Sequence, residues 1–196
     1  MISISKTLPV KLRISMVAIH IDSVNKATYR WLDKVIIEEN FCPFAKAPRL
    51  NNSIRLKVAE ESDTALMLQH LLEELEYLIV NKNIETSLVV YSCALEDFND
   101  YLDFLEFSNE LLFREGYEGI FQLASFHPDY CFEGTPQNCA SNYTNRSPYP
   151  MIHVIREASI ERALTSFSKP ERIPLRNIEH AKTLGKCFFE KYGKNS

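Results

Sequence analysis

The feature that most constrains the fold is the order in which helix-like and strand-like segments follow one another. Between residues 23 and 126, segments with helical periodicity alternate with short β-prone runs. The helical segments span about 23–40, 62–79 and 97–115, and the runs span 53–59, 88–91 and 120–126. Such an alternation implies crossover connections, which make strands parallel and pack helices against the sheet. We therefore expect one α/β domain with a mostly parallel sheet of about four strands.

Two of these runs also indicate where they lie in the sheet. In the run 53–59, three aliphatic residues alternate with Arg55 and Lys57, which is typical of a half-buried edge strand. The run 88–91 is continuously apolar, as in a strand that is covered on both faces. A further run, 151–155, is too short for its periodicity to distinguish a strand from a helix.

The domain is expected to begin at Ser23, which is suited to cap the first helix, so residues 1–22 are interpreted as an N-terminal extension and 23–196 as the domain. The extension is mildly apolar from Leu12 to Ile21. Arg13 and His20 interrupt that stretch and no small-residue cleavage site follows, which argues against a signal peptide.

Composition restricts the partners. The net charge of -4 gives no reason to expect nucleic acid, and no apolar run approaches the roughly 18 to 20 residues of a membrane span. Five cysteines without repeated spacing indicate reduced thiols in a cytoplasmic protein rather than a disulfide framework. The five glycines form neither a P-loop nor a dinucleotide fingerprint. The sequence therefore identifies no cofactor, and the cofactor is unknown. The expected partner is a small molecule, with no nucleic acid and no membrane.

The segment 126–150, FHPDYCFEGTPQNCASNYTNRSPYP, is the most informative for function. It contains five aromatic residues, whereas disordered segments are poor in aromatics. Long ordered loops in compact domains are usually functional, and aromatic anchors beside polar groups are typical of a binding site. We expect this loop to form the wall of such a site.

Cys42, His127 and Asp129 are the candidate catalytic residues. His127 and Asp129 follow a strand, at the carboxyl edge where ligands bind in open parallel sheets. Pro43 suits the first position of a helical turn, whose amides would stabilise a Cys42 thiolate. The sequence therefore predicts that Cys42 and His127 lie close enough for acyl transfer. Equally, Cys42 could pack as a small hydrophobe and His127 could cap its strand.

A metal site is a second possibility. His127, Asp129, Glu133, His153 and Cys42 are all ligand types, and two histidines with a carboxylate can hold zinc or iron. No CxxC or HExxH spacing is present, so no metal ligands are assigned.

Asn142, Thr144, Asn145, Arg146 and His153 are the candidate substrate-binding residues. Arg146 offers a planar fork of donors that suits a carboxylate or phosphate, and its polar neighbours could add neutral hydrogen bonds. Arg146 could instead clamp the loop through a nearby carboxylate.

The chain contains five further distinctive segments, CPFA (Cys42–Ala45), YLDFLE (Tyr101–Glu106), FQLASFHPDY (Phe121–Tyr130), FEGT (Phe132–Thr135) and NYTNRSPYPMIHVIREASIERAL (Asn142–Leu164). In these segments it resembles the bacterial domain-of-unknown-function family 1415. The resemblance covers nearly everything after Val24, and Cys131 stands where a polar residue is more typical. It implies an ancient cytoplasmic protein and no mechanism, because the family has no established reaction.

The function expected from these features is an enzyme that acts on a small, possibly anionic metabolite. Hydrolysis or acyl transfer by Cys42 and His127 is its most concrete form. The alternatives are a noncatalytic module that binds a small ligand or a protein through the loop 127–150, and a metal-dependent enzyme with a histidine and carboxylate site.

Overall fold

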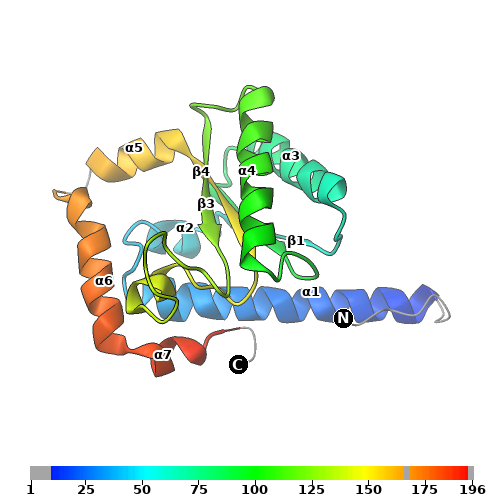
Figure 1. Ribbon diagram of the computed structural model, residues 1–196. Helices are drawn as coiled ribbons and strands as arrows, with labels where there is room; N and C mark the ends of the chain where they lie inside the picture. Colours follow the sequence, from blue (N-terminus) through cyan, green and yellow to red (C-terminus); the bar gives the residue numbers. More distant parts are fainter. Residues whose placement is uncertain (1–9, 166–167, 194–196) are drawn as a thin grey trace.

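A four-stranded sheet organises the chain in the computed structural model, which describes residues 10–165 and 168–193 (Figure 1). The strands are β1 (Ile54–Ala59), β2 (Thr86–Tyr91), β3 (Phe121–Phe126) and β4 (Met151–Arg156). The α-helices are α1 (Val10–Trp31), α2 (Lys46–Leu50), α3 (Thr64–Val80), α4 (Phe98–Arg114), α5 (Glu157–Thr165), α6 (Ile173–Leu184) and α7 (Lys186–Glu190). A π-helical segment, η1 (Leu32–Ile37), continues α1, and two short 3-10 helices are η2 (Ala140–Thr144) and η3 (Pro170–Arg172). The α/β class with four strands is confirmed.

The sheet is mixed, so the expectation of a mostly parallel sheet is wrong. The strand order is β1-β2-β4-β3, in which β1 and β2 are parallel and β4 is antiparallel to both of its neighbours. The loop after β3 leaves the carboxyl edge and returns to that edge, where Tyr91 N donates to Pro150 O (2.9 Å). A strand that starts at the carboxyl edge must run back across the sheet, which makes β4 antiparallel. As expected, β1 is an edge strand and β2 is buried throughout.

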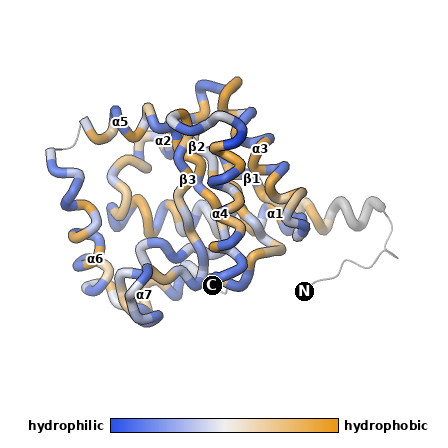
Figure 2. The backbone as a smooth tube through the Cα atoms, turned by 45° about the horizontal axis from the view of Figure 1, so that its top comes forward, coloured by the Kyte–Doolittle hydropathy of each residue, from blue (hydrophilic) through white to orange (hydrophobic). Residues whose placement is uncertain are grey.

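Two hydrophobic clusters cover the two faces of the sheet. On one face, α3 and α4 contribute Leu71, Leu75 and Phe104 to a cluster that includes Val89 and Val154. On the other face, the cluster combines residues of α1, η1, α6 and α7 with Leu88, Val90 and Met151. Figure 2 shows hydrophilic and hydrophobic residues alternating along α4, as expected for a helix with one face on the core.

The first helix begins earlier than expected. α1 starts at Val10, and Asp22 pairs with Lys26 (2.6 Å) one helical turn away, so Ser23 lies inside the helix and does not cap it. The first nine residues of the expected extension lie outside the described part of the chain. None of the described helices combines the length and apolar character that a membrane span requires.

A buried carboxylate links α3 to the sheet. Glu74 is 2% exposed, and its Oε1 accepts hydrogen bonds from Arg55 Nε (2.7 Å) and Ser87 Oγ (2.6 Å). The Arg55 guanidinium also lies 4.0 Å from the ring centroid of Tyr77. A buried charge is costly unless it is paired and hydrogen-bonded, so Glu74 depends on both partners.

We expect Arg55→Met to lower the free energy of unfolding by about 2–4 kcal/mol, because Glu74 would stay buried without its counter-charge. Urea unfolding followed by circular dichroism measures the change. Arg114→Met is the control, because the Arg114–Glu110 pair is exposed at both side chains (75% and 53%) and such pairs contribute about 0.5 kcal/mol. Equal losses in the two variants would contradict the buried role of the Arg55–Glu74 pair.

Candidate functional site

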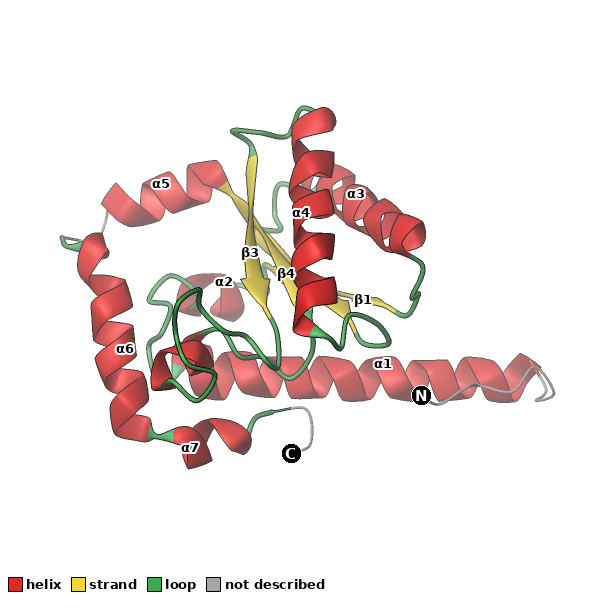
Figure 3. Cartoon of the chain, in the orientation of Figure 1, coloured by secondary structure: helices red, strands yellow, loops and turns green. Residues whose placement is uncertain are grey.

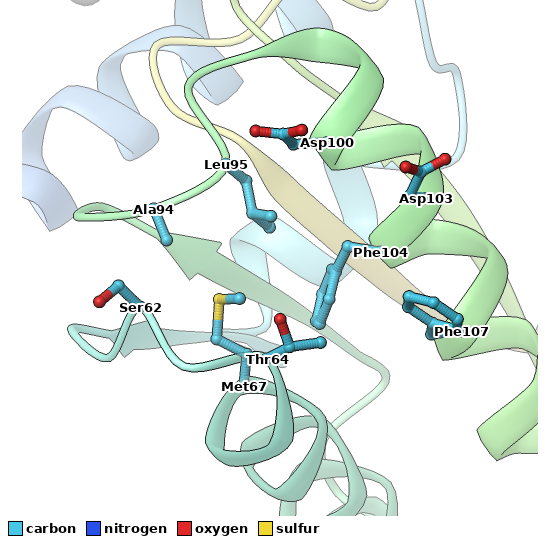
Figure 4. A pocket seen from close by; sticks show the side chains of 9 residues that line it. All are labelled: Ser62, Thr64, Met67, Ala94, Leu95, Asp100, Asp103, Phe104 and Phe107. Atoms are coloured by element: carbon cyan, nitrogen blue, oxygen red, sulfur yellow. The ribbon is translucent and has the colours of Figure 1, made fainter.

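A hollow of about 380 Å³ lies between the amino-terminal ends of α3 and α4, at the carboxyl edge of β2 (Figure 4). Met67, Leu95, Phe104 and Phe107 supply its apolar wall, and Asp100 and Asp103 supply carboxylates. Asp63 and Asp97 cap the two helices by accepting from the helices' own amides, at 3.0 and 2.8 Å. We call this cavity the edge hollow. Because amides at both helix ends already bond to Asp63 and Asp97, and the lining carries two carboxylates, the edge hollow does not favour an anionic ligand.

A more enclosed cavity of about 450 Å³ lies on the opposite face of the sheet, flanked by α2 and α5. We call it the sheet cavity. Its apolar lining includes Trp31, Leu32, Ile36, Ala47, Pro48, Ile54, Leu88, Phe126, Ile155, Ile160 and Ala163. Ligand sites of this size are usually apolar pockets with a few polar groups that orient the ligand. The sheet cavity is therefore the candidate functional site.

The main polar feature of this cavity is a hydrogen-bonded pair, Thr86 and His153. Thr86 pairs with Ile155 and Leu88 pairs with His153, so the two side chains are diagonal neighbours on one face. Thr86 Oγ1 lies 2.6 Å from the carbonyl oxygen of Val154 and 2.6 Å from Nε2 of His153. The carbonyl can only accept, so the hydroxyl gives it its single proton. Nε2 must then donate to Thr86, which leaves Nδ1 as the unprotonated nitrogen of the ring.

His153 is held neutral by its surroundings. Burial lowers the pKa of His153 from its ordinary 6.5 to about 4, because the imidazolium would lose its hydration. Nδ1 has no hydrogen-bond partner among the described residues. A neutral imidazole with a free Nδ1 can accept a hydrogen bond from a ligand.

Cys42 also lines the sheet cavity, at the start of the turn that the CPFA motif forms. Ala45 N donates to Cys42 O (3.2 Å), so the expected turn is present. Burial raises the pKa of the Cys42 thiol, and this outweighs the amides of Phe44 and Ala45, which lower it. The turn therefore holds a thiol rather than the activated thiolate that the sequence suggested.

His127 is fully buried and serves the loop structure on the other face. Its Nε2 donates to Leu95 O (2.9 Å), and its Nδ1 accepts from Asp129 N (3.0 Å). Its ring contacts those of Phe98 and Tyr101, with centroids 5.1 Å apart in each case. Both ring nitrogens are thus used to fix the loops after β2 and β3.

The structure does not bring the three expected catalytic residues together. Cys42 packs against the cluster that includes α1, whereas His127 packs against α4 on the opposite face, so the prediction that they lie close is wrong. Asp129 is exposed. Within the described residues, no group of three or more His, Cys, Asp or Glu side chains could hold a metal ion. The sheet itself lies between Cys42 and His127, because the two side chains pack into the clusters on its opposite faces.

Asn142 organises the long loop. It is fully buried, and its Oδ1 accepts from Phe132 N (3.1 Å) and Thr135 Oγ1 (2.9 Å). Its Nδ2 donates to the carbonyl oxygens of Pro136 (2.9 Å) and Gln137 (3.3 Å). Every hydrogen-bonding atom of this amide is used within the loop, so Asn142 is not positioned to bind a ligand.

Arg146 uses its donors on the same loop. Nε donates to Tyr130 O (3.1 Å), and one Nη donates to Gln137 O (2.7 Å) and Oε1 (3.0 Å). The guanidinium lies 4.5 Å from the ring centroid of Tyr143. The clamp anticipated for Arg146 is therefore present, with carbonyl and amide oxygens in place of carboxylates.

Thr144 and Asn145 complete this network. Thr144 Oγ1 lies 2.8 Å from Ser141 O and 3.0 Å from Asn145 Oδ1, and Asn145 Nδ2 donates to Ser125 O (3.2 Å). Trp31 of α1 donates to Arg146 O (2.8 Å), which fastens the loop to the helix below it (Figure 3). Of the expected substrate-binding residues, only His153 lines the sheet cavity.

The sequence analysis missed Thr86 and most of the apolar lining. Thr86 belongs to no recognisable sequence motif. Its hydrogen bond with His153 depends on the register between β2 and β4. Trp31 could be read only as a core residue of its helix, whereas Phe126 is one of the five aromatic residues expected in the wall of a site. Their rings meet edge to face at 5.2 Å beside the cavity. No local pattern in the sequence distinguishes such residues from ordinary core residues.

The fold and the site together define an α/β protein with a mixed four-stranded sheet and a ligand-sized apolar cavity on one face. The chain belongs to the family described as Protein of unknown function (DUF1415), whose model matches residues 23–191, as the motifs indicated. No curated protein and no solved structure matches the chain. Membership assigns no reaction, so a functional argument depends on the geometry.

We expect Arg146→Lys to lower the free energy of unfolding by about 1 kcal/mol without any ligand, because lysine cannot bond both Tyr130 O and Gln137 O and loses the stacking of the guanidinium on Tyr143. Arg114→Lys on the exposed face of α4 is the matched control. Urea denaturation measures both. If Arg146→Lys unfolds like the control, the clamp contributes little and a ligand-binding role for Arg146 regains support.

His153 gives a second prediction, for acid stability. The pKa of His153 is about 4 in the folded protein and near 6.5 in the unfolded chain, so the unfolded chain binds the proton first as pH falls. Its contribution is present above about pH 6.5 and is lost on the way down to about pH 4. We expect His153→Gln, which retains a donor for Thr86, to lose less stability than wild type between about pH 7 and 5. Urea unfolding at both pH values measures this, and equal losses would contradict it.

Proposed function

We propose that this protein binds a small, uncharged, mostly apolar molecule in the sheet cavity, with His153 Nδ1 accepting a hydrogen bond from it. The observation that carries the proposal is a nitrogen acceptor, His153 Nδ1, that has no hydrogen-bond partner among the described residues and belongs to a mostly apolar wall. An apolar wall favours burial of a ligand's hydrocarbon surface, and a single acceptor of fixed tautomer orients it. A ligand with one hydroxyl or N–H group would satisfy this acceptor.

The charges around the cavity favour an uncharged ligand over the anionic metabolite first expected. Glu85 is a carboxylate in the lining, and it is bridged by Arg162 from α5 (3.1 Å). The described lining contains no lysine or arginine. An anion there would face a carboxylate and a neutral imidazole, and its desolvation would have no compensating partner.

Among the functions that the sequence suggested, a noncatalytic small-ligand module has the best support. Acyl transfer by Cys42 and His127 requires the two side chains within hydrogen-bond reach, and they pack on opposite faces of the sheet. In the loop 127–150, Asn142 and Arg146 already form hydrogen bonds with other groups of the loop. The proposed ligand site is therefore the cavity rather than that loop.

A blocked cavity tests the proposal. Saturation-transfer NMR can screen a library of small neutral phenols, alcohols and amides, together with carboxylates of matched size as the anionic comparison. We expect hits among the neutral compounds. Ala163→Trp fills the cavity and should abolish their binding. Ala158→Trp is the control, because Ala158 is exposed on the same helix outside the lining. Hits that survive in Ala163→Trp would show that the compounds bind elsewhere and would contradict the proposal.

Thr86→Val tests the role of the tautomer. Without the hydroxyl, the proton of the His153 ring is no longer fixed on Nε2, so Nδ1 is no longer held as the acceptor. We therefore expect compounds that donate a hydrogen bond to bind about tenfold more weakly, which corresponds to the loss of one hydrogen bond. Methyl ethers of the same hits, which lack the donor, should bind both proteins alike. Equal affinity of the donor compounds for wild type and Thr86→Val would contradict the hydrogen bond to His153.

A further inference from the structure

A second group of reactive side chains lies at the carboxyl edge of β2, away from the sheet cavity. Cys93 Sγ lies 3.8 Å from Nε2 of His20 and 3.7 Å from Oγ of Ser92. Ser92 Oγ in turn lies 3.1 Å from the same Nε2. The thiol, hydroxyl and imidazole are therefore in mutual contact, although α1 supplies His20 and the loop after β2 supplies the other two.

The placement of this group suits a reaction with a small molecule. Cys93 is exposed, so a reagent can reach its sulfur. The next two residues, Ala94 and Leu95, line the edge hollow, whose apolar wall includes Phe104 (Figure 4). Ligands of open α/β sheets bind beyond the carboxyl ends of the strands, which is where this group lies.

We propose that Cys93, His20 and Ser92 form a nucleophilic thiol site that takes small uncharged carbon electrophiles. As Sγ attacks the electrophilic carbon, its proton passes to Nε2 of His20, directly or through the Ser92 hydroxyl. One S–C bond forms, and the leaving group departs with the electron pair of the bond that breaks. The carboxylates of Asp100 and Asp103 in the neighbouring hollow disfavour anionic electrophiles. This site is independent of the sheet cavity.

Cys187 supplies an internal standard for the test. It is also an exposed free cysteine, and none of its described contacts is with a histidine. Iodoacetamide is the probe: it is uncharged, and iodide leaves when its carbon bonds to sulfur. The rates at Cys93 and Cys187 are measured in one sample of the intact protein at a single neutral pH, by peptide mass spectrometry at timed quenches.

We expect Cys93 to react about tenfold faster than Cys187, as base assistance to a thiol implies. In His20→Gln the two rates should come within about twofold of each other, while Cys187 keeps its wild-type rate. Ser92→Ala separates the two proton routes: unchanged reactivity assigns direct transfer to His20, and a loss as large as that in His20→Gln assigns transfer through the hydroxyl. A Cys93 rate equal to that of Cys187 in wild type, or one unaffected by His20→Gln in a protein with a wild-type melting temperature, would overturn the proposal.

Discussion

β4 is hydrogen-bonded to β2 on one side and to β3 on the other, with His153 opposite Leu88 and Ala124. Side chains alternate along a strand, so this register directs His153 into the sheet cavity and Val154 towards α3 and α4. A slip of one residue would exchange the two faces and bury the imidazole under α3 and α4. The bond from Thr86 to Val154 O, which fixes the imidazole tautomer, depends on the same register. The position of β4 is thus the constraint on which the candidate site depends.

The loop that precedes β4 makes this position possible. It must leave the carboxyl edge after β3 and return to it before Met151, and it does so with its polar groups bonded to one another. Asn142 and Arg146 each join backbone groups from separate parts of the loop, and His127 ties it to the loop after β2. The Asn142 amide is fully buried and would cost about 1–3 kcal/mol without its partners, so these bonds stabilise the loop in this conformation. The loop is a scaffold for β4 rather than the wall of a ligand site.

The two proposed sites use different chemistry because their surroundings differ. The sheet cavity lies at the amino ends of β1 and β2, where Ile54 and Thr86 begin their strands, and its enclosure keeps His153 neutral and Cys42 protonated. Cys93 and His20 lie at the opposite, carboxyl edge of β2, and the thiol is exposed there. Enclosure in an apolar wall favours binding of an uncharged molecule, whereas exposure of a thiol beside an imidazole favours reaction with one.

The sequence by itself determined the elements up to β3, their order and the family. Alternating periodicities placed β1, β2, β3, α3 and α4, the mixed polarity of β1 marked it as an edge, and the motifs identified the family that the match over residues 23–191 confirms. His153 and Cys42 were also chosen from the sequence, and both line the sheet cavity. Only the tertiary structure decided the direction of β4, because a loop's return path is a property of the whole chain. It also decided that His127 and Arg146 act on loop carbonyls, and that Thr86 meets His153 and His20 meets Cys93. Those pairings depend on strand register and helix placement, which join residues far apart in the sequence and leave no local periodicity to detect.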